Sequence, residues 1–466
     1  MSDDSSTRIV ADLRRWIASV PPGTRLPSSR ELRQRHRAGP ATVQKALHAL
    51  AAQGLVESRP GVGTFTLAIR TPRTVDFGWQ TTALGTAGFR DGHGPTSLET
   101  IPNSVIGMHS GYPCRELLPE KLVRAAFARA TRAENLMGRP PVAGLPDLQS
   151  WFATELAGAT PDGVAPVSPS DVVVIPGSQS GLVTAFRALA GAGRPILVES
   201  PTYWGAMLAA RQAGVQVVPV PSGPAGPSPE AVAESLGRTG ARVFYAQPTF
   251  ANATGWLWPR DRADAVLDAV RAAGAFLIED DWAHDFAIDA APQPLASRDD
   301  AGHVVYLRSL TKSVAPATRV AGLVARGPAR DRILADHGAE ALYVSGILQT
   351  VALDVVTQPA WRTHLRRVTE QLRGRRDLLL EALVRHAPQA RVEAVPRGGL
   401  NAWVRLPDDA VVADVVARCR ADGLTVGDGG EWFPAEPAGR YVRMNYAAAE
   451  PSQLGRAAEI LGAALR

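Results

Sequence analysis

The first 68 residues alternate apolar and polar positions in a way that predicts three helices and then two strands. Apolar side chains recur at helical spacing over residues 8–17, and a pair of prolines then ends the helix. A serine at position 28 or 29 can cap a second helix that runs to about residue 35. The third helix is expected to begin at Pro40 and to end before Gly54. Two short strands follow, at residues 55–58 and 64–67, on either side of a glycine-rich turn.

This order of elements is typical of a winged helix-turn-helix, in which the third helix enters the major groove of DNA and the wing contacts an adjacent groove or the backbone. Residues 1–68 carry ten basic and five acidic side chains, an excess that equals the whole formal net charge of +5. A basic end on a neutral body points to double-stranded DNA as a partner. A merely solvated basic face is the alternative.

Strand-like and helix-like segments alternate along the rest of the chain, as in an α/β domain. Apolar runs predict strands at residues 172–175, 196–199, 215–220, 242–246 and 275–278. Polar or aromatic residues follow each run, and ligands of open α/β sheets bind at the carboxyl ends of the strands. The sequence therefore predicts a ligand site along that edge of the sheet.

Residues 69–104 are rich in glycine, proline and threonine, lack a sustained period, and are predicted to be a linker. Their aromatic residues Phe77, Trp79 and Phe89 argue against full disorder and could dock on the second domain. The predicted organisation is a DNA-binding domain at 1–68, the linker at 69–104 and a larger domain at 105–466.

Composition and cysteine usage favour a soluble cytoplasmic protein. Hydrophobic residues make up 45% of the chain and charged residues 20%, which is ordinary for a globular protein. The polar, acid-containing start resembles neither a secretory signal nor a transit peptide, and no uncharged apolar run is long enough to span a membrane. Cys114 and Cys419 lie far apart and form no metal or redox motif, which fits a reducing compartment.

Lys312 is the first candidate for covalent chemistry, because it stands among small residues just after the apolar run at 303–307. A partly desolvated amine near another cation has a lowered pKa and can form a Schiff base with a carbonyl. Ser309 and Arg319 supply a hydroxyl and a guanidinium, which are donors that hold a phosphate monoester. Together they suggest pyridoxal phosphate, although a solvated surface lysine is the alternative.

Asp280 and the turn at residues 176–181 add to this constellation. A carboxylate at the end of a buried strand keeps the nitrogen of a pyridine cofactor protonated; alternatively, Asp280 caps a helix or pairs with an arginine. The turn contains Ser178 and Gln179 and opens a helix whose free amides can bind phosphate. A purely structural helix cap is the other interpretation of that turn.

Residues 7–67 resemble the DNA-binding domain of GntR-type regulators, in the motif LPSSREL and in the helix and ribbon ATVQKALHALAAQGLVESRPGVGTF. The resemblance implies the following DNA contacts: Arg30, Thr42, Gln44, Arg59 and Gly61. Gly39-Pro40 stands where the family often has Ser-Arg, so an arginine that reads guanine is missing. A bidentate arginine–guanine pair gives about 1–3 kcal/mol of discrimination between bases, so the preferred DNA half-site could differ from the one usual in the family.

From about residue 105 onward the chain resembles the fold-type-I aminotransferases, and the whole chain is similar to the MocR-type members of the GntR regulators. The resemblance implies an α/β fold with a mixed, mostly parallel sheet, helices on both faces and a smaller C-terminal α+β subdomain. It also implies that Lys312 holds pyridoxal phosphate as the internal aldimine and that Asp280 is the partner of the ring nitrogen.

The same resemblance implies further roles, one position at a time. The phosphate would be held by four residues, namely Ser178, Gln179, Ser309 and Arg319. Tyr203 would stack on the cofactor ring, and Asn252 in Asn-Ala-Thr-Gly would bond its phenolic oxygen. Arg443 in YVRMNYAAAEPSQL would bind the α-carboxylate of a substrate or effector; a strand-end salt bridge is the alternative.

Two positions depart from the family. Trp282 follows Asp280-Asp281 where the family commonly has a tyrosine, so a phenol near the cofactor is lost, and Asn252 could partly replace it. Arg139 stands where a tyrosine usually reaches the phosphate of the neighbouring subunit, and its charge could serve the same phosphate. These changes leave cofactor binding plausible and lower the expectation of transamination.

Three functions follow from these observations. The favoured one is a homodimeric transcription regulator that binds DNA and senses an amino acid or an amine through pyridoxal phosphate on Lys312. The second is a working aminotransferase with an attached DNA-binding domain. The third is a cofactor-free repressor that uses its large domain only to dimerise.

Overall fold

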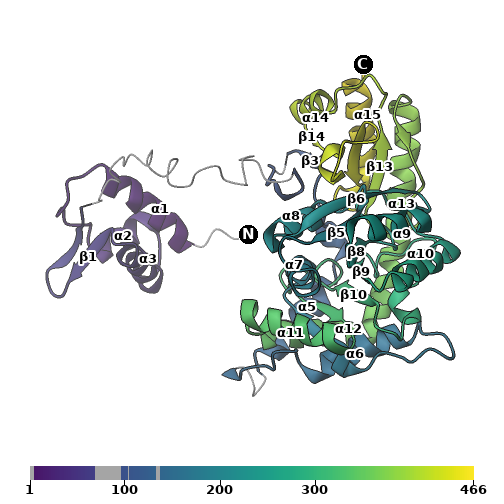
Figure 1. Cartoon of the computed structure of the whole chain (residues 1–466). Helices are drawn as coiled ribbons and strands as arrows, with labels where there is room; N and C mark the ends of the chain where they lie inside the picture. The colour runs from purple at the N-terminus through teal and green to yellow at the C-terminus, as the bar shows by residue number, and fades with distance from the viewer. Residues whose placement is uncertain (1–4, 69–95, 103, 133–136) are drawn as a thin grey trace. The chain divides into compact units, whose positions relative to one another are not determined.

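The computed structural model describes residues 5–68, 96–102, 104–132 and 137–466. Contacts divide the chain into two compact units, Met1–Arg90 and Asp91–Arg466 (Figure 1), and each unit has a hydrophobic core of its own. Most of the predicted linker, with Phe77, Trp79 and Phe89, lies outside the described residues. The predicted domain boundaries therefore remain predictions.

The first unit has the predicted order of three helices and a ribbon. Its elements are α1 (Ser5–Ala18), α2 (Ser29–His36), α3 (Pro40–Ala52), β1 (Val56–Arg59) and β2 (Gly63–Thr66). One apolar side of each helix meets in a small core that includes Ile9, Leu32 and Leu50. Ser28 caps α2 in a reciprocal pair of hydrogen bonds with Glu31, which explains why the helix begins where it does.

The ribbon of this unit is antiparallel, with Glu57 opposite Phe65. Its turn contains Gly61 at φ +72°, a left-handed conformation that glycine adopts at little cost. The Arg59 guanidinium lies 5.0 Å from the centroid of the Phe65 ring, so the base of the wing is held by a cation–π contact.

The second unit is built on an eight-stranded sheet in the order β4-β11-β10-β9-β8-β5-β6-β7. The strands are β4 (Val172–Ile175), β5 (Pro195–Ser200), β6 (Gln216–Gly223), β7 (Gly226–Pro227), β8 (Val243–Ala246), β9 (Phe276–Asp281), β10 (Val304–Ser309) and β11 (Ala321–Val324). Strands β6, β5, β8, β9 and β10 pair in parallel, whereas β7 and β11 pair antiparallel with their neighbours. The mixed, mostly parallel sheet is as predicted.

Helices cover both faces of this sheet (Figure 1). They are α5 (Glu120–Ala130), α6 (Pro146–Ala157), α7 (Ser178–Leu189), α8 (Trp204–Ala213), α9 (Pro229–Thr239), α10 (Arg260–Ala272), α11 (Gly327–Ala341) and α12 (Gly346–Thr357). Successive residues of a strand point to opposite faces, so Leu277 packs in the core that includes α9 and α10, and Ile278 in the core that includes α7 and α8. Burial on both faces explains why these strands are continuous apolar runs.

The C-terminal part forms the predicted smaller α+β subdomain. The long helix α13 (Pro359–His386) packs with α14 (Val412–Ala421) and α15 (Pro451–Ala464) around a four-stranded sheet. That sheet has the order β12 (Arg391–Val392), β13 (Asn401–Arg405), β16 (Tyr441–Asn445), β15 (Gly427–Asp428). A separate pair joins β14 (Leu424–Thr425) to β3 (Ile106–Gly107) in parallel, so the start of this unit lies against its C-terminal part. In the described part of the chain, no helix is both long and apolar enough to cross a membrane.

Candidate cofactor site

One cavity brings the predicted site residues together. It lies where β8, β9 and β10 end and α7 begins, at the carboxyl edge of the parallel strands. Its walls are formed by Tyr112, Ser178, Gln179, Tyr203, Gln247, Asn252, Asp280, Trp282, Ser309, Thr311, Lys312 and Arg319. All eight residues predicted to contact the cofactor are among them. Their individual roles remain predictions.

Lys312 lies in the turn after β10, with its ammonium nitrogen 4.1 Å from the centroid of the Trp282 ring and 5.9 Å from that of Tyr112. Burial lowers the pKa of Lys312 to about 7, an effect that Asp280 opposes and Arg443 reinforces. At neutral pH a large fraction of this amine is therefore unprotonated. That is the form that attacks a carbonyl carbon.

Asp280 is buried at the end of β9, and its two oxygens differ. Oδ2 accepts hydrogen bonds from the Tyr245 hydroxyl at 2.9 Å and from the Gln247 side-chain amide at 2.8 Å. Oδ1 is buried and has no partner among the described residues. Burial raises the pKa of Asp280 to about 6, while Gln247 and Tyr245 hold it down. The carboxylate thus keeps one oxygen for a further hydrogen-bond donor.

Donors suited to a phosphate monoester gather at the start of α7. Gly177 precedes that helix at φ +86°, and a Cβ atom built there would lie 2.9 Å from the guanidinium carbon of Arg319. The Ser178 and Thr311 hydroxyls are buried and have no partner among the described residues. Ser309 lines the same cavity. Hydroxyls, a guanidinium and helix N-terminal amides are the donors that hold phosphate, so these residues fit the phosphate of pyridoxal phosphate.

Arg443 lies beside the cavity rather than in its wall. It is fully buried on β16, where its Nη1 donates to Asn252 Oδ1 at 3.1 Å. Its guanidinium carbon lies 4.6 Å from the centroid of the Trp432 ring. Burial lowers the pKa of Arg443 to about 10. Arg443 thus reaches the cavity through Asn252.

The two departures from the family pattern have clear positions. Trp282 donates its indole N–H to the Phe250 carbonyl oxygen at 3.0 Å, so that N–H is not free to replace the missing phenol. The Arg139 guanidinium lies 5.7 Å from the centroid of the Tyr343 ring. The contact of Arg139 with a neighbouring subunit's phosphate remains a prediction.

Sequence reasoning missed several residues of the site. Tyr112, Thr311 and Gln247 line the cavity, and Tyr245 holds Asp280 from outside it. Gln247 could have been found, because it directly follows the strand predicted at 242–246, where the strand-end rule applies. Tyr112 carries no such signal.

The residues predicted to contact DNA lie on the surface expected for such a contact. Gln44 is exposed and Thr42 half-buried on α3, next to the buried stripe that faces the core. Arg30 is exposed on α2, and Arg59 and Gly61 are exposed in the wing. Contacts between these side chains and DNA remain predictions.

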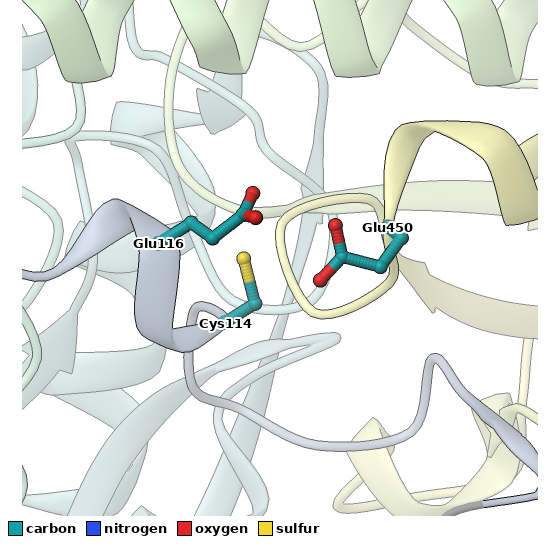
Figure 2. Close-up of side chains that lie close together, drawn as sticks. All are labelled: Cys114, Glu116 and Glu450. Carbon is teal, nitrogen blue, oxygen red and sulfur yellow. The ribbon is translucent and has the colours of Figure 1, made fainter.

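A possible metal-binding group lies elsewhere in the second unit. Figure 2 shows Cys114, Glu116 and Glu450, whose candidate ligand atoms all lie within 4.8 Å of one another. Glu116 already pairs with Arg375 at 3.1 Å, and the Glu450 side chain accepts a backbone hydrogen bond at the start of α15. Since a cation would have to compete with both interactions, we assign no metal to this group.

The fold and the cavity together define a pyridoxal-phosphate-dependent type of domain joined to a winged helix-turn-helix. The family model "Aminotransferase class I and II" matches residues 103–461, and the model "Bacterial regulatory proteins, gntR family" matches residues 5–66. The chain belongs to the class I and II aminotransferase family, whose members bind pyridoxal phosphate, and carries a GntR-type DNA-binding domain. This combination is that of the MocR-type regulators, as the sequence predicted.

Relatives of both kinds are similar to this chain. The uncharacterized HTH-type transcriptional regulator YdfD of Bacillus subtilis is 25% identical over 95% of this chain and 92% of its own. The probable rhizopine catabolism regulatory protein MocR of Rhizobium meliloti is 28% identical over 78% of this chain and 73% of its own. The 2-aminoadipate transaminase of Thermus thermophilus is 28% identical over 78% and 90%. A structure of the α-aminoadipate aminotransferase LysN from that organism, complexed with N-(5'-phosphopyridoxyl)-L-leucine, has a TM-score of 0.72 at 27% identity and covers 78% of this chain and 92% of its own.

Proposed function

We propose that this protein is a transcription regulator that binds DNA through residues 1–68 and senses an amino acid or an amine through pyridoxal phosphate held on Lys312. One observation carries the proposal. A lysine with a pKa lowered to about 7 shares a cavity with Asp280 and with the phosphate donors around α7. A DNA-binding unit adds nothing to catalysis, which favours regulation over metabolism.

Five residues of the cavity have a task in this proposal. When bound, pyridoxal phosphate supplies a carbonyl carbon that bonds covalently to amines and a ring that withdraws electrons. Ser178, Ser309 and Arg319 would bind its phosphate, and Asp280 Oδ1, which has no partner among the described residues, would accept the hydrogen bond of its ring nitrogen. Lys312 would hold the cofactor covalently, and the amine of an effector would compete with the lysine for that position.

An effector amine that displaced Lys312 from the cofactor would change both charge and contacts in the buried cavity. An effector can shift the arrangement of the DNA-binding units only through different affinities for the two states of the protein. We expect a homodimer, because paired DNA-binding units match paired half-sites. We expect the protein to lie in the cytoplasm, because DNA is its proposed partner.

Transamination is a second candidate, because Lys312 and Asp280 line the same cavity. Lys312, whose pKa burial lowers to about 7, would be the general base and acid that moves the α-proton of a bound amino acid. Formation of a keto acid from the effector would distinguish turnover from sensing.

The first experiment is an absorbance spectrum of the protein loaded with pyridoxal phosphate, for the wild type and for Lys312→Ala. We expect a band of lysine-bound cofactor in the wild type alone, and a shift of that band with particular amino acids or amines. Absence of a lysine-dependent band would contradict the proposal and favour a cofactor-free dimerisation domain.

DNA binding has a separate test. Affinity for the protein's own upstream region should fall steeply as salt rises, because binding releases counterions from the phosphates. Deletion of residues 1–68 should abolish it. Binding that survives the deletion would refute the assignment of this unit.

A further inference from the structure

The first described residues of the second unit form a short turn, Thr96–Leu98, which is held by hydrogen bonds to Arg443 and to a residue near it. Ser97 is 7% exposed, and its hydroxyl oxygen accepts a hydrogen bond from Arg443 Nη2 at 3.1 Å. The Thr96 backbone N–H and hydroxyl both donate to the Glu431 carboxylate, at 2.9 and 3.1 Å. The turn therefore covers the arginine that is predicted to bind an effector carboxylate.

Three of the five N–H donors of Arg443 have hydrogen-bond partners among the described residues. Nη1 donates to Asn252, and Nη2 donates to both Ser97 and the His109 carbonyl oxygen. Of its nitrogen atoms, only Nε has no partner among the described residues. A carboxylate binds a guanidinium best through two parallel N–H bonds. Each parallel pair of a guanidinium includes an Nη2 N–H, and both N–H bonds of Nη2 are already used, by Ser97 and by the His109 carbonyl oxygen. The Ser97 side chain can rotate away, whereas the His109 carbonyl is fixed in the backbone, so Ser97 is the acceptor that a carboxylate would displace.

Glu99, the residue that follows the turn, is also held by contacts outside the segment. The Glu99 carbonyl oxygen lies 3.1 Å from His109 Nε2, and the Glu99 carboxylate pairs with Arg420. Thr96, Ser97 and Glu99 thus each hold the segment to the C-terminal part of the unit or to the loop beside it. Among Thr96, Ser97 and Glu99, Ser97 is the residue that bonds Arg443, so its contact is the one that competes directly with a ligand carboxylate.

The exchange is favourable by its chemistry. The Ser97 hydroxyl is a neutral acceptor, whereas a carboxylate forms charge-assisted hydrogen bonds, which are roughly twice as strong. Arg443 is fully buried, and in such surroundings an ionic partner gains more than it does in water. An amine that lacks a carboxylate has no carboxylate oxygen that could replace the Ser97 hydroxyl as the acceptor at Arg443.

We propose that Ser97 is a built-in competitor for Arg443, and that an effector carboxylate displaces it and loosens the segment 96–99. This inference rests on the proposed function, since the effector amine is taken to be held through Lys312. Toward the N-terminus, the chain runs from this segment to the DNA-binding unit. Loosening the segment gives the effector a route to that unit, and Ser97 makes the response selective for ligands that carry a carboxylate.

The test compares ligand pairs that differ only in the carboxylate. L-alanine with ethylamine, L-leucine with 3-methylbutylamine, and L-phenylalanine with phenethylamine are added to the cofactor-loaded full chain. Absorbance reports on Lys312, and hydrogen–deuterium exchange of the peptide that spans residues 96–99 reports on the segment. We expect both classes of ligand that enter the cavity to shift the absorbance and only the amino acids to speed the exchange.

Two variants sharpen the comparison. Ser97→Ala removes the competitor, so amino acids should bind about tenfold more tightly, equivalent to about 1.4 kcal/mol, while the affinity for amines stays the same. Leu98→Ala is the matched control, because Leu98 lies in the same turn and is 62% exposed. It should change neither affinity.

The possible results separate the two proposals. Equal loosening by amines and amino acids, or a Ser97→Ala protein that binds both classes as the wild type does, would overturn the role of Ser97 and leave the sensing function intact. An absorbance that responds to neither class would refute the sensing function, and the role of Ser97 with it.

Discussion

Replacement of Gln247 by leucine tests how the protein keeps Asp280 charged inside the cavity. The Gln247 side-chain amide donates to Asp280 Oδ2 at 2.8 Å, and its side-chain oxygen accepts the Asn252 backbone N–H at 2.9 Å. Leucine has a similar size and no donor. The variant should therefore retain the packing and lose one of the two hydrogen bonds that stabilise the Asp280 carboxylate.

The size of the effect follows from the pKa of Asp280. A hydrogen bond to a charged group contributes about 1.5–3 kcal/mol, and one pKa unit corresponds to about 1.4 kcal/mol. The folded-state pKa of Asp280, about 6 in the wild type, should rise by about one to two units. The unfolded carboxyl titrates near its ordinary value in both proteins. The variant should therefore lose about 1.5–3 kcal/mol of unfolding free energy as the pH rises from about 6 to about 8, and this loss should be absent below pH 6.

Urea unfolding of the cofactor-free full chain at pH 5 and pH 8 measures this difference. Gln349→Leu is the matched control, because Gln349 is an equally buried glutamine that bonds only backbone groups, the Leu145 N–H and the Val344 carbonyl oxygen. The loss of unfolding free energy caused by Gln349→Leu should be the same at both pH values. If Gln247→Leu also costs the same at pH 5 and pH 8, Gln247 does not stabilise the charge of Asp280 and the reasoning fails.

Arg308→Met should destabilise the large unit by about 3–5 kcal/mol, because Arg308 is 3% exposed and its loss leaves the buried carboxylate of Asp285, 3.1 Å away, without its partner. Urea unfolding checks this, and a second change, Asp285→Leu, should restore part of the loss. Ser28→Ala should cost about 0.5–2 kcal/mol in α2, because it removes the cap that bonds Glu31. Faster amide exchange in residues 29–36 is the expected sign, and unchanged exchange would argue against the cap. Arg59→Ala should reduce the salt dependence of DNA binding by about one phosphate contact, and an unchanged slope would place Arg59 away from the backbone.

Much of the fold followed from the sequence because local pattern and burial agree in it. Residues 172–175 were predicted as a strand and form β4 with the same limits. The order of helices and strands in residues 5–68 was equally readable, since α2 has a serine cap and α3 has a proline at its start. Lys312 and Asp280 were found because each follows or ends a buried apolar run.

The rest depended on which strands are neighbours, and the sequence pattern does not reveal that. Gln247 meets Asp280 because β8 lies beside β9, although 33 positions separate them in the chain. Strand β9 was predicted to end at Ile278 and runs on to Asp281, because its acidic residues find buried partners such as Tyr306, whose hydroxyl donates to Asp281 at 2.8 Å. The contact between Ser97 and Arg443 joins residues 346 positions apart, which no periodicity predicts.

The side-by-side ends of β5, β8 and β9 limit how this protein can change in evolution. Glu199, Gln247 and Asp280 are linked across these strands, since the Gln247 backbone N–H donates to Glu199 at 2.8 Å and its side chain donates to Asp280. Insertion or deletion of one residue within any of the three strands would turn its functional side chain to the opposite face of the sheet. Insertions and deletions should therefore be tolerated in the loops at the opposite edge of the sheet. Among related chains, the number of positions between each of these three residues and the last apolar residue of its strand should stay constant.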